Sequence, residues 1–251
     1  MFFQHRAFWL SKDVQRPDEY QDAYHLDARR GIAAIADGVS SSLFAGSWAK
    51  LLSRSVVADP PDVTDAAGLP EWLNKLREQW REPIDVDSLP WHQKARFQAG
   101  ASSTLLWVEL YVAEASDPAA TGPIQLYGYA IGDCCLFHIR SDRLLQSFPL
   151  DKSELFDTDP NAIASVNRQK DHVLQFETLV DYCQDGDLLV LCTDAIAAWA
   201  LAQTEAGSAP SWEACWDFSE EAWRAQILEL RQQHKIRYDD STVLLLRISN
   251  K

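Results

Sequence analysis

Short apolar runs separated by turn-forming residues dominate this sequence, and they limit the folds open to it. The runs are rich in Leu, Ile, Val and aromatic residues, which favour β-strands over loops. We predict strands at residues 32–36, 104–112, 124–131, 135–139, 188–192 and 243–248. Weaker signals at residues 8–10 and 173–176 suggest two more strands. The chain is therefore expected to contain a large β component.

Helical periodicity appears between these strand-like runs. Apolar residues spaced three and four apart predict helices at residues 44–57, 71–81, 195–202 and 219–233. Ser219, followed by two glutamates, is a favourable start for the last helix. Gly132-Asp133 is typical of a hairpin turn between two of the strands. Strands in groups, with helices between the groups, predict an α+β fold.

Length and charge limit the class of protein further. The chain has 251 residues and no stretch that resembles an interdomain linker, so a single domain over residues 1–251 is expected. The net charge of -14 excludes a typical nucleic-acid surface and a polybasic membrane contact. No pattern indicates an oligomer, so we expect a monomer.

The cysteines and the N-terminus point to a cytoplasmic protein. The sequence contains 5 Cys but no CxxC motif, which argues against a zinc knuckle and a redox pair. Free thiols fit a reducing compartment. The first residues do not form a signal peptide, and the apolar stretch 188–202 is interrupted by Asp194 and is too short to span a bilayer.

Aspartates recur where the predicted strands begin or end. Such positions can meet at one edge of a sheet, where loops carried by rigid elements build functional sites. The residues concerned are Asp22, Asp37, Asp133, Asp194, Asp239 and Asp240. A single Asp at a strand end is more often a turn former or a helix cap. Asp194 could cap the following helix and Asp133 could shape its turn, so position alone leaves both interpretations open.

A cluster of these carboxylates would favour a divalent cation. Carboxylates at close range cannot all ionise without a countercharge, and ligands that are all oxygen select Mg²⁺, Mn²⁺ or Ca²⁺ over zinc. Two such ions, about 3.5–4 Å apart, can clamp a phosphate group during in-line displacement. The sequence offers no convincing Cys or Ser nucleophile, which agrees with hydrolysis by water.

Six motifs occur in an order that resembles the type 2C (metal-dependent) Ser/Thr protein phosphatase family, bacterial-type members in particular. They are QDA at 21–23, IADGV at 35–39, GASST at 100–104, YAIGD at 129–133, LVLCTD at 189–194 and DDSTV at 239–243. Gly46 and a predicted helix follow the second motif, as in the family. The matches run from about residue 21 to residue 248. Each motif is weak alone, but the ordered set is fairly specific.

The resemblance implies an α/β/β/α sandwich, in which two antiparallel sheets pack together and helices lie outside. It also implies hydrolysis of phosphoserine or phosphothreonine in proteins by a metal-activated water, with two or three Mg²⁺ or Mn²⁺ ions. Asp37 would bridge two ions, with the Gly38 carbonyl as a further ligand. Asp194 and Asp239 would complete the first ion, and these three aspartates would be the catalytic set.

The remaining family roles fall on more peripheral residues. The resemblance implies that Asp22 holds water of the second ion and that Asp133 binds a third. The family's phosphate-binding Arg lies five residues before its opening Asp, whereas Arg16 is six residues before Asp22. We predict Arg16 for this role because a guanidinium suits phosphate, although a solvated surface Arg is an equal alternative. Arg6 and Lys12 are the other candidates.

Departures from the family pattern leave two other functions open. Residues 39–42 read VSSS where the family often has two glycines, Ala195 replaces a Gly, and Gln21 replaces an acid. A pseudophosphatase, with the same fold serving as a regulatory binding module, is the first alternative. An acidic interaction domain that binds no metal is the second.

Overall fold

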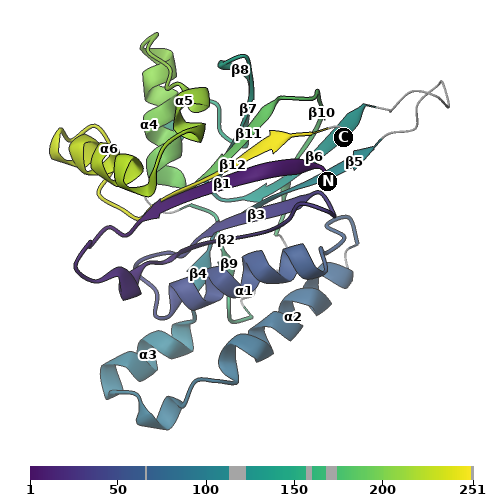
Figure 1. Ribbon diagram of the computed structural model, residues 1–251. Helices are drawn as coiled ribbons and strands as arrows, with labels where there is room; N and C mark the ends of the chain where they lie inside the picture. Colours follow the sequence, from purple (N-terminus) through teal and green to yellow (C-terminus); the bar gives the residue numbers. More distant parts are fainter. Residues whose placement is uncertain (66, 113–122, 157–159, 168–173, 250–251) are drawn as a thin grey trace.

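Two five-stranded antiparallel sheets lie face to face and make the centre of the protein (Figure 1). The computed structural model describes residues 1–65, 67–112, 123–156, 160–167 and 174–249. The first sheet has the order β1 (Phe3–Leu10), β12 (Ser241–Ile248), β11 (Leu188–Cys192), β7 (Cys135–Arg140) and β8 (Arg143–Phe148). The second has the order β10 (Glu177–Cys183), β6 (Ile124–Ile131), β5 (Leu105–Val112), β3 (Ile32–Asp37) and β2 (Asp22–Asp27). A small sheet pairs β4 (Ser102–Ser103) with β9 (Ile163–Ala164).

Helices cover both outer faces of this pair of sheets, as Figure 1 shows. One group of helices packs on the second sheet and another group on the first sheet. The former are α1 (Ala45–Ala58), α2 (Gly68–Arg81) and α3 (Trp91–Ala99), and the latter are α4 (Asp194–Glu205), α5 (Trp212–Trp216) and α6 (Glu220–Gln232). Short 3-10 turns occupy Pro17–Glu19, Val86–Ser88 and Ser153–Leu155. The architecture is the predicted α/β/β/α sandwich, and the α+β class is confirmed.

Strand alternation explains why the central strands are apolar on both faces. In β11, Leu189 and Leu191 join the core between the two sheets, whereas Val190 packs against the helices on the outer face. Successive side chains of a strand point to opposite faces, so a central strand of a four-layer protein needs apolar residues at every position. The adjacent residues Cys134 and Cys135 divide in the same way between two cores.

Most of the predicted elements are present, with ends shifted by a few residues. Ser219 caps α6, because its side chain accepts a hydrogen bond from the Ala222 amide. The strand predicted at residues 173–176 is wrong for residues 174–176, which precede β10, and residue 173 lies outside the described part. β2, β8, β10, α3, α5 and the two-residue strands β4 and β9 were not predicted from the sequence. The first two are mixed in polarity and half exposed, so they lack the apolar run that identifies a buried strand.

The Gly132-Asp133 turn does not form the predicted hairpin. β6 pairs with β5 and β10 in the second sheet, whereas β7 pairs with β11 and β8 in the first. The chain therefore crosses from one sheet to the other at this turn. Gly132 is required there because its φ is +97° and an added Cβ would lie 2.4 Å from the Thr104 side chain. The crossover carries Asp133 into the space between the ends of the two sheets.

Two further observations concern the sequence-based expectations. All five cysteines are free and buried in the structure. Within the described ranges, no helix has the length and apolar character needed to cross a membrane.

Candidate metal centre

The predicted aspartates converge at one end of the sandwich. Asp22 begins β2 and Asp37 ends β3, and the two are directly paired across these strands. Asp194 is the first residue of α4, immediately after β11, and Asp239 lies just before β12. The side chains of Asp37, Asp133, Asp194 and Asp239 line a single cavity of about 470 Å³. The structure thus brings together acids that are far apart in the sequence.

The backbone around Asp37 is held by the serine-rich segment before β5. The Asp37 carbonyl accepts hydrogen bonds from the Thr104 amide at 2.9 Å and the Ser103 hydroxyl at 2.8 Å. Gly38 is fixed by packing, because an added Cβ would lie 2.7 Å from the backbone of Ala45 at the start of α1. The GASST segment and the Asp37-Gly38 pair therefore contact each other and hold one carboxylate at the end of β3.

Asp22 connects the two sheets. Its Oδ2 accepts hydrogen bonds from the hydroxyls of Thr193, at 3.0 Å, and Thr242, at 2.6 Å, which belong to the opposite sheet and its connection to α4. Its Oδ1 is buried and has no hydrogen-bond partner among the described residues. A buried carboxylate oxygen without a donor is costly, so Asp22 leaves one position that a water or an ion-bound ligand would satisfy.

Burial and mutual repulsion raise the pKa values of these acids. Burial raises the pKa of Asp37 well above its usual range, and the charges of Asp22 and Asp194 add to this effect. The pKa of Asp133 rises to about 7, mainly through burial and then through the charge of Asp194. Burial also raises the pKa of Asp22, with Asp240 as the next cause. Each carboxyl is therefore harder to ionise in the isolated protein than in water.

Two basic side chains partly offset this negative charge. The Lys12 ammonium lies 3.4 Å from Asp239 Oδ1 and donates to Gln21 Oε1 and Ser40 Oγ as well. Arg237 Nη1 lies 3.2 Å from Asp194 Oδ2, so the pKa of Asp194, raised mainly by burial and by Asp239, is lowered in part by Arg237. The other Asp194 oxygen, Oδ1, is buried and has no hydrogen-bond donor in the described part of the chain. The cluster retains more acids than bases.

The residues present fit divalent cations. The donors are carboxylate oxygens, two of them are buried without partners, and the pKa shifts show that positive charge is lacking. Hard oxygen ligands of this kind suit Mg²⁺ or Mn²⁺. Among the described residues, the oxygens of these aspartates do not form a group of three that all lie within 4.8 Å of one another.

Asp239 and Asp240 are adjacent but differ in their surroundings. The Asp239 side chain is 39% exposed and faces the cavity. The Asp240 side chain is buried and accepts hydrogen bonds of 2.7 Å from the amides of Lys12 and Gln21. Asp240 therefore fastens two backbone segments, whereas Asp239 remains available to a ligand.

Arg16 does not line the cavity. Its guanidinium pairs with Asp13 at 2.7 Å and with Glu19 at 2.6 Å, and 61% of its side chain is exposed. Lys12, the alternative named from the sequence, has its ammonium beside Asp239 instead. Sequence reasoning missed Arg237, which lies two residues before the DDSTV motif and belongs to none of the six motifs.

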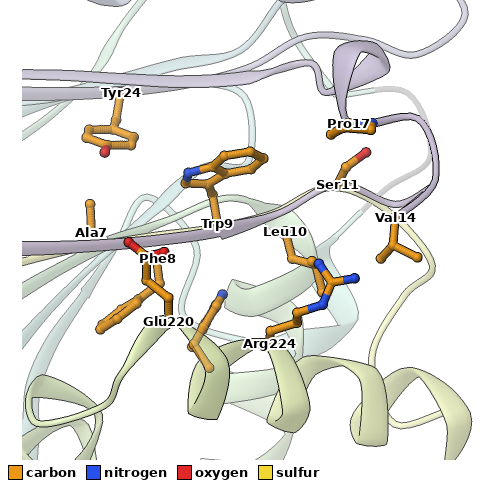
Figure 2. A pocket seen from close by; sticks show the side chains of 11 residues that line it. Ala7, Phe8, Trp9, Leu10, Ser11, Val14, Pro17, Tyr24, Glu220 and Arg224 are labelled. Carbon is orange, nitrogen blue, oxygen red and sulfur yellow. The ribbon is translucent and has the colours of Figure 1, made fainter.

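A second cavity, of about 330 Å³, is shown in Figure 2. It lies along β1 and α6, where Trp9 points toward Tyr24 and where Glu220 and Arg224 come from the helix. Glu220 is its only acidic lining residue. This cavity therefore lacks a set of metal ligands, in contrast to the aspartate cavity.

The sandwich with acids at one end is the fold of the type 2C Ser/Thr phosphatases, bacterial ones included, as the sequence motifs predicted. Neither a family model nor a curated protein matches the sequence. Similar solved structures include Stp1 from Staphylococcus aureus, at 11% identity and a TM-score of 0.63, covering 99% of this chain and 96% of that chain. The catalytic domain of the phosphatase PstP, solved with two manganese ions, is 18% identical with a TM-score of 0.54 and 99% coverage of both chains.

PppA from Pseudomonas aeruginosa, described as a key regulatory component of its T6SS, is 16% identical to this protein. The match covers 99% of this chain and 98% of that chain, with a TM-score of 0.58. At these identities the comparisons establish the fold.

Proposed function

We propose that this protein is a Mg²⁺- or Mn²⁺-dependent phosphatase that hydrolyses phosphoserine and phosphothreonine in proteins, with residues 1–251 as one phosphatase-like domain. The proposal depends on one observation. Carboxylates from five separate segments meet at one end of the sandwich, and among the described residues only two basic side chains pair with them there. Buried acids in such excess favour binding of a divalent cation.

The proposed ligands follow from the placement of each residue. Asp37, Asp194 and Asp239, with the Gly38 carbonyl, would hold the central pair of ions. Asp22 would act through its unpartnered Oδ1, and Asp133 would bind a third ion. When bound, such ions activate water as a nucleophile and neutralise charge on a phosphate. The chain itself contributes a rigid arrangement of acids at the ends of β3, β6 and β11.

Lys12 and Arg237 are placed to bind the substrate phosphate. Arg237 lines the cavity, and the Lys12 ammonium contacts Asp239 at its rim. Positive groups beside the reacting phosphate stabilise the charge on its oxygens. Arg16 keeps this role only if it leaves its ion pairs with Asp13 and Glu19, so we propose Lys12 and Arg237 first.

The class of substrate and the compartment are proposed from the similar structures and from the cysteines. PstP and Stp1 are named as serine/threonine phosphatases, and this supports a phosphoprotein substrate for a chain with the same fold. The five free, buried thiols are compatible with the reducing cytoplasm, where we propose that the protein acts.

Mn²⁺-dependent hydrolysis of p-nitrophenyl phosphate and of a phosphothreonine peptide tests the proposal. We expect activity in the wild type and a loss of at least about 100-fold in Asp37→Ala and Asp239→Ala. Asp151→Ala is the control because Asp151 is an exposed acid that does not line the cavity. An active Asp37→Ala variant would contradict the proposed role of this cavity.

A pseudophosphatase is the second candidate. It is favoured by the VSSS segment after Gly38, by Ala195, and by the regulatory description of PppA. This candidate predicts thermal stabilisation by Mn²⁺ with no hydrolysis in Mg²⁺ or Mn²⁺. If Mn²⁺ neither stabilises the protein nor appears near Asp37 in a soaked crystal, an acidic interaction domain is the remaining interpretation.

A further inference from the structure

A buried arginine of α6, Arg231, joins the two chain segments that carry Lys12 and Asp239. Its Nη1 donates to the carbonyls of Ser11, at 2.9 Å, and Lys12, at 3.4 Å. Its Nη2 donates to the carbonyls of Leu10, at 3.3 Å, and Asp239, at 2.7 Å, and to Ser241 Oγ at 3.1 Å. One guanidinium thus fixes the end of β1 relative to the start of β12.

The side chains of the same two segments meet at the rim of the cavity, where Asp239 lines it. The Lys12 ammonium and the Asp239 carboxylate are 3.4 Å apart, while the backbone carbonyls of both residues are bonded to Arg231. Asp240 adds a bond to the Lys12 amide. The separation between the ammonium and the carboxylate is therefore set by groups that do not themselves face the cavity.

An arginine is a costly choice for this position. Arg231 is only 9% exposed, and its hydrogen bonds go to neutral oxygens. Its guanidinium lies 5.7 Å from the centre of the Tyr238 ring, and its Nε is buried without a hydrogen-bond partner among the described residues. Burying an unpaired cation is unfavourable, so packing alone would be better served by an apolar side chain. The guanidinium offers a rigid fork with several donors, which is the property that holding several carbonyls in a fixed arrangement requires.

We propose that Arg231 is a positioning residue that fixes the Lys12 ammonium relative to the Asp239 carboxylate and thereby sets the affinities for metal and phosphate. The inference rests on the proposed function. Groups that orient ligands without touching the metal typically change its affinity by about 10- to 100-fold when they are removed. A purely structural Arg231 would change stability and leave both affinities unaltered.

The test measures Mn²⁺ affinity by calorimetry and steady-state hydrolysis of p-nitrophenyl phosphate in Arg231→Met and Arg231→Lys. For Arg231→Met we expect a rise of about 10-fold in the Mn²⁺ dissociation constant and a rise in KM. The change in kcat at saturating Mn²⁺ should be smaller, about threefold. Arg231→Lys should recover part of the affinity, because an ammonium can still donate to some of the carbonyls.

Arg247→Met is the matched control. Arg247 pairs with Glu213 at 2.6 Å and stacks on Trp216, away from the cavity. Its replacement therefore removes a half-buried arginine contact that does not involve Lys12 or Asp239. We expect unchanged Mn²⁺ affinity and KM in this variant.

The outcomes separate the inference from the function on which it rests. A folded Arg231→Met variant with wild-type Mn²⁺ affinity and KM would overturn the positioning role. If Arg231→Met does not fold, Arg231→Lys decides in the same way, with an expected rise of about threefold in the dissociation constant. Failure of the proposed function would appear in the wild type, as no binding of Mn²⁺ and no hydrolysis, and the inference would fall with it.

Discussion

Two clusters of buried acids in this protein differ in the charges that surround them. Asp187 lies at the end of the first sheet that is far from the cavity. Its carboxylate accepts hydrogen bonds from Arg140 Nε and Nη2, each at 2.7 Å, and from the Gln184 amide at 2.7 Å. His138 lies between Asp187 and Asp181, at 2.9 and 2.8 Å. In the aspartate cavity, no basic side chain of the described residues forms an ion pair with Asp37.

The pKa values report this difference. Burial raises the pKa of Asp187, but hydrogen bonds from Arg140, Gln184 and His138 together lower it by more, so the net shift is downward. The net shifts of Asp22, Asp37, Asp133 and Asp194 are upward. The Asp187 cluster is neutralised by basic side chains of the protein itself, whereas the described residues of the aspartate cavity carry fewer positive than negative charges. An incomplete cluster indicates a ligand, whereas a complete one indicates a structural role.

The complete cluster nevertheless has the spacing of a metal site. Ligand atoms of His138, Cys183 and Asp187 lie within 4.8 Å of one another. The Asp187 oxygens are already occupied by Arg140, and burial raises the pKa of the Cys183 thiol, whose thiolate would be the ligand. Geometry alone would select this group, but its hydrogen bonds favour an ion-pair network.

Removing Asp187 should have the largest effect on stability. Asp187→Asn leaves the buried His138 and the half-buried Arg140 without their carboxylate, so we expect a loss of about 3 kcal/mol in the free energy of unfolding. Urea denaturation of the metal-free protein measures it. Asp151→Asn, at an exposed acid, should stay within about 0.5 kcal/mol of the wild type. Equal stability of the two variants would show that the His138 network contributes little.

Manganese should stabilise the protein through the other cluster. At about 100 times its dissociation constant, Mn²⁺ should add about 2.7 kcal/mol to the free energy of unfolding, measured by thermal denaturation. Asp37→Asn should lose this gain, and Asp187→Asn should keep it because its side chain lies outside the cavity. If Asp187→Asn lost this stabilisation and Asp37→Asn retained it, the metal would bind at the Asp187 cluster and not in the aspartate cavity.

The pH dependence of stability should reverse when Mn²⁺ binds. In the metal-free protein the pKa of Asp133 is about 7, above its unfolded value near 4, so the folded state binds more protons between these values. Stability should therefore rise by about 1 kcal/mol as the pH falls from 7.5 to 6. With Mn²⁺, protons compete with the metal and stability should fall over the same interval.

The contribution of Asp187 to this profile has the opposite sign. Its pKa is lowered on folding, so its contribution is complete above the unfolded value near 4 and is lost as the pH falls through the folded value. Asp187→Asn should therefore preserve the slope between pH 7.5 and 6. If stability changed with pH in the same way with and without Mn²⁺, metal binding by the aspartates with raised pKa values would be contradicted.

Cys183 should give the smallest effect. We expect Cys183→Ala to lose about 1 kcal/mol of stability through a small cavity and to leave the Mn²⁺ shift unchanged. Zinc calorimetry on the wild type and this variant should give matching curves. A zinc affinity that disappears in Cys183→Ala would show that the spacing of the three side chains reflects a real metal site.

The sequence identified the local elements because each is specified by its own residues. Strands such as β11 need apolar side chains on both faces, and α6 begins at a serine that caps it. The acids at the strand ends were visible for the same reason. What each acid contacts was not visible, since Asp239 and Asp240 are identical and adjacent but lie in different environments.

Sequence alone thus determined the α+β class, most strands and helices, and the set of candidate aspartates. The tertiary structure decided that Gly132-Asp133 crosses between sheets, that Lys12 rather than Arg16 has its charged group beside Asp239, and that Arg231 joins both segments. Side-chain alternation and capping act over a few residues and can be read along the chain. Strand pairing and the approach of charges depend on segments far apart in the sequence, such as those of Lys12 and Asp239, which are 227 residues apart, and only folding brings those together.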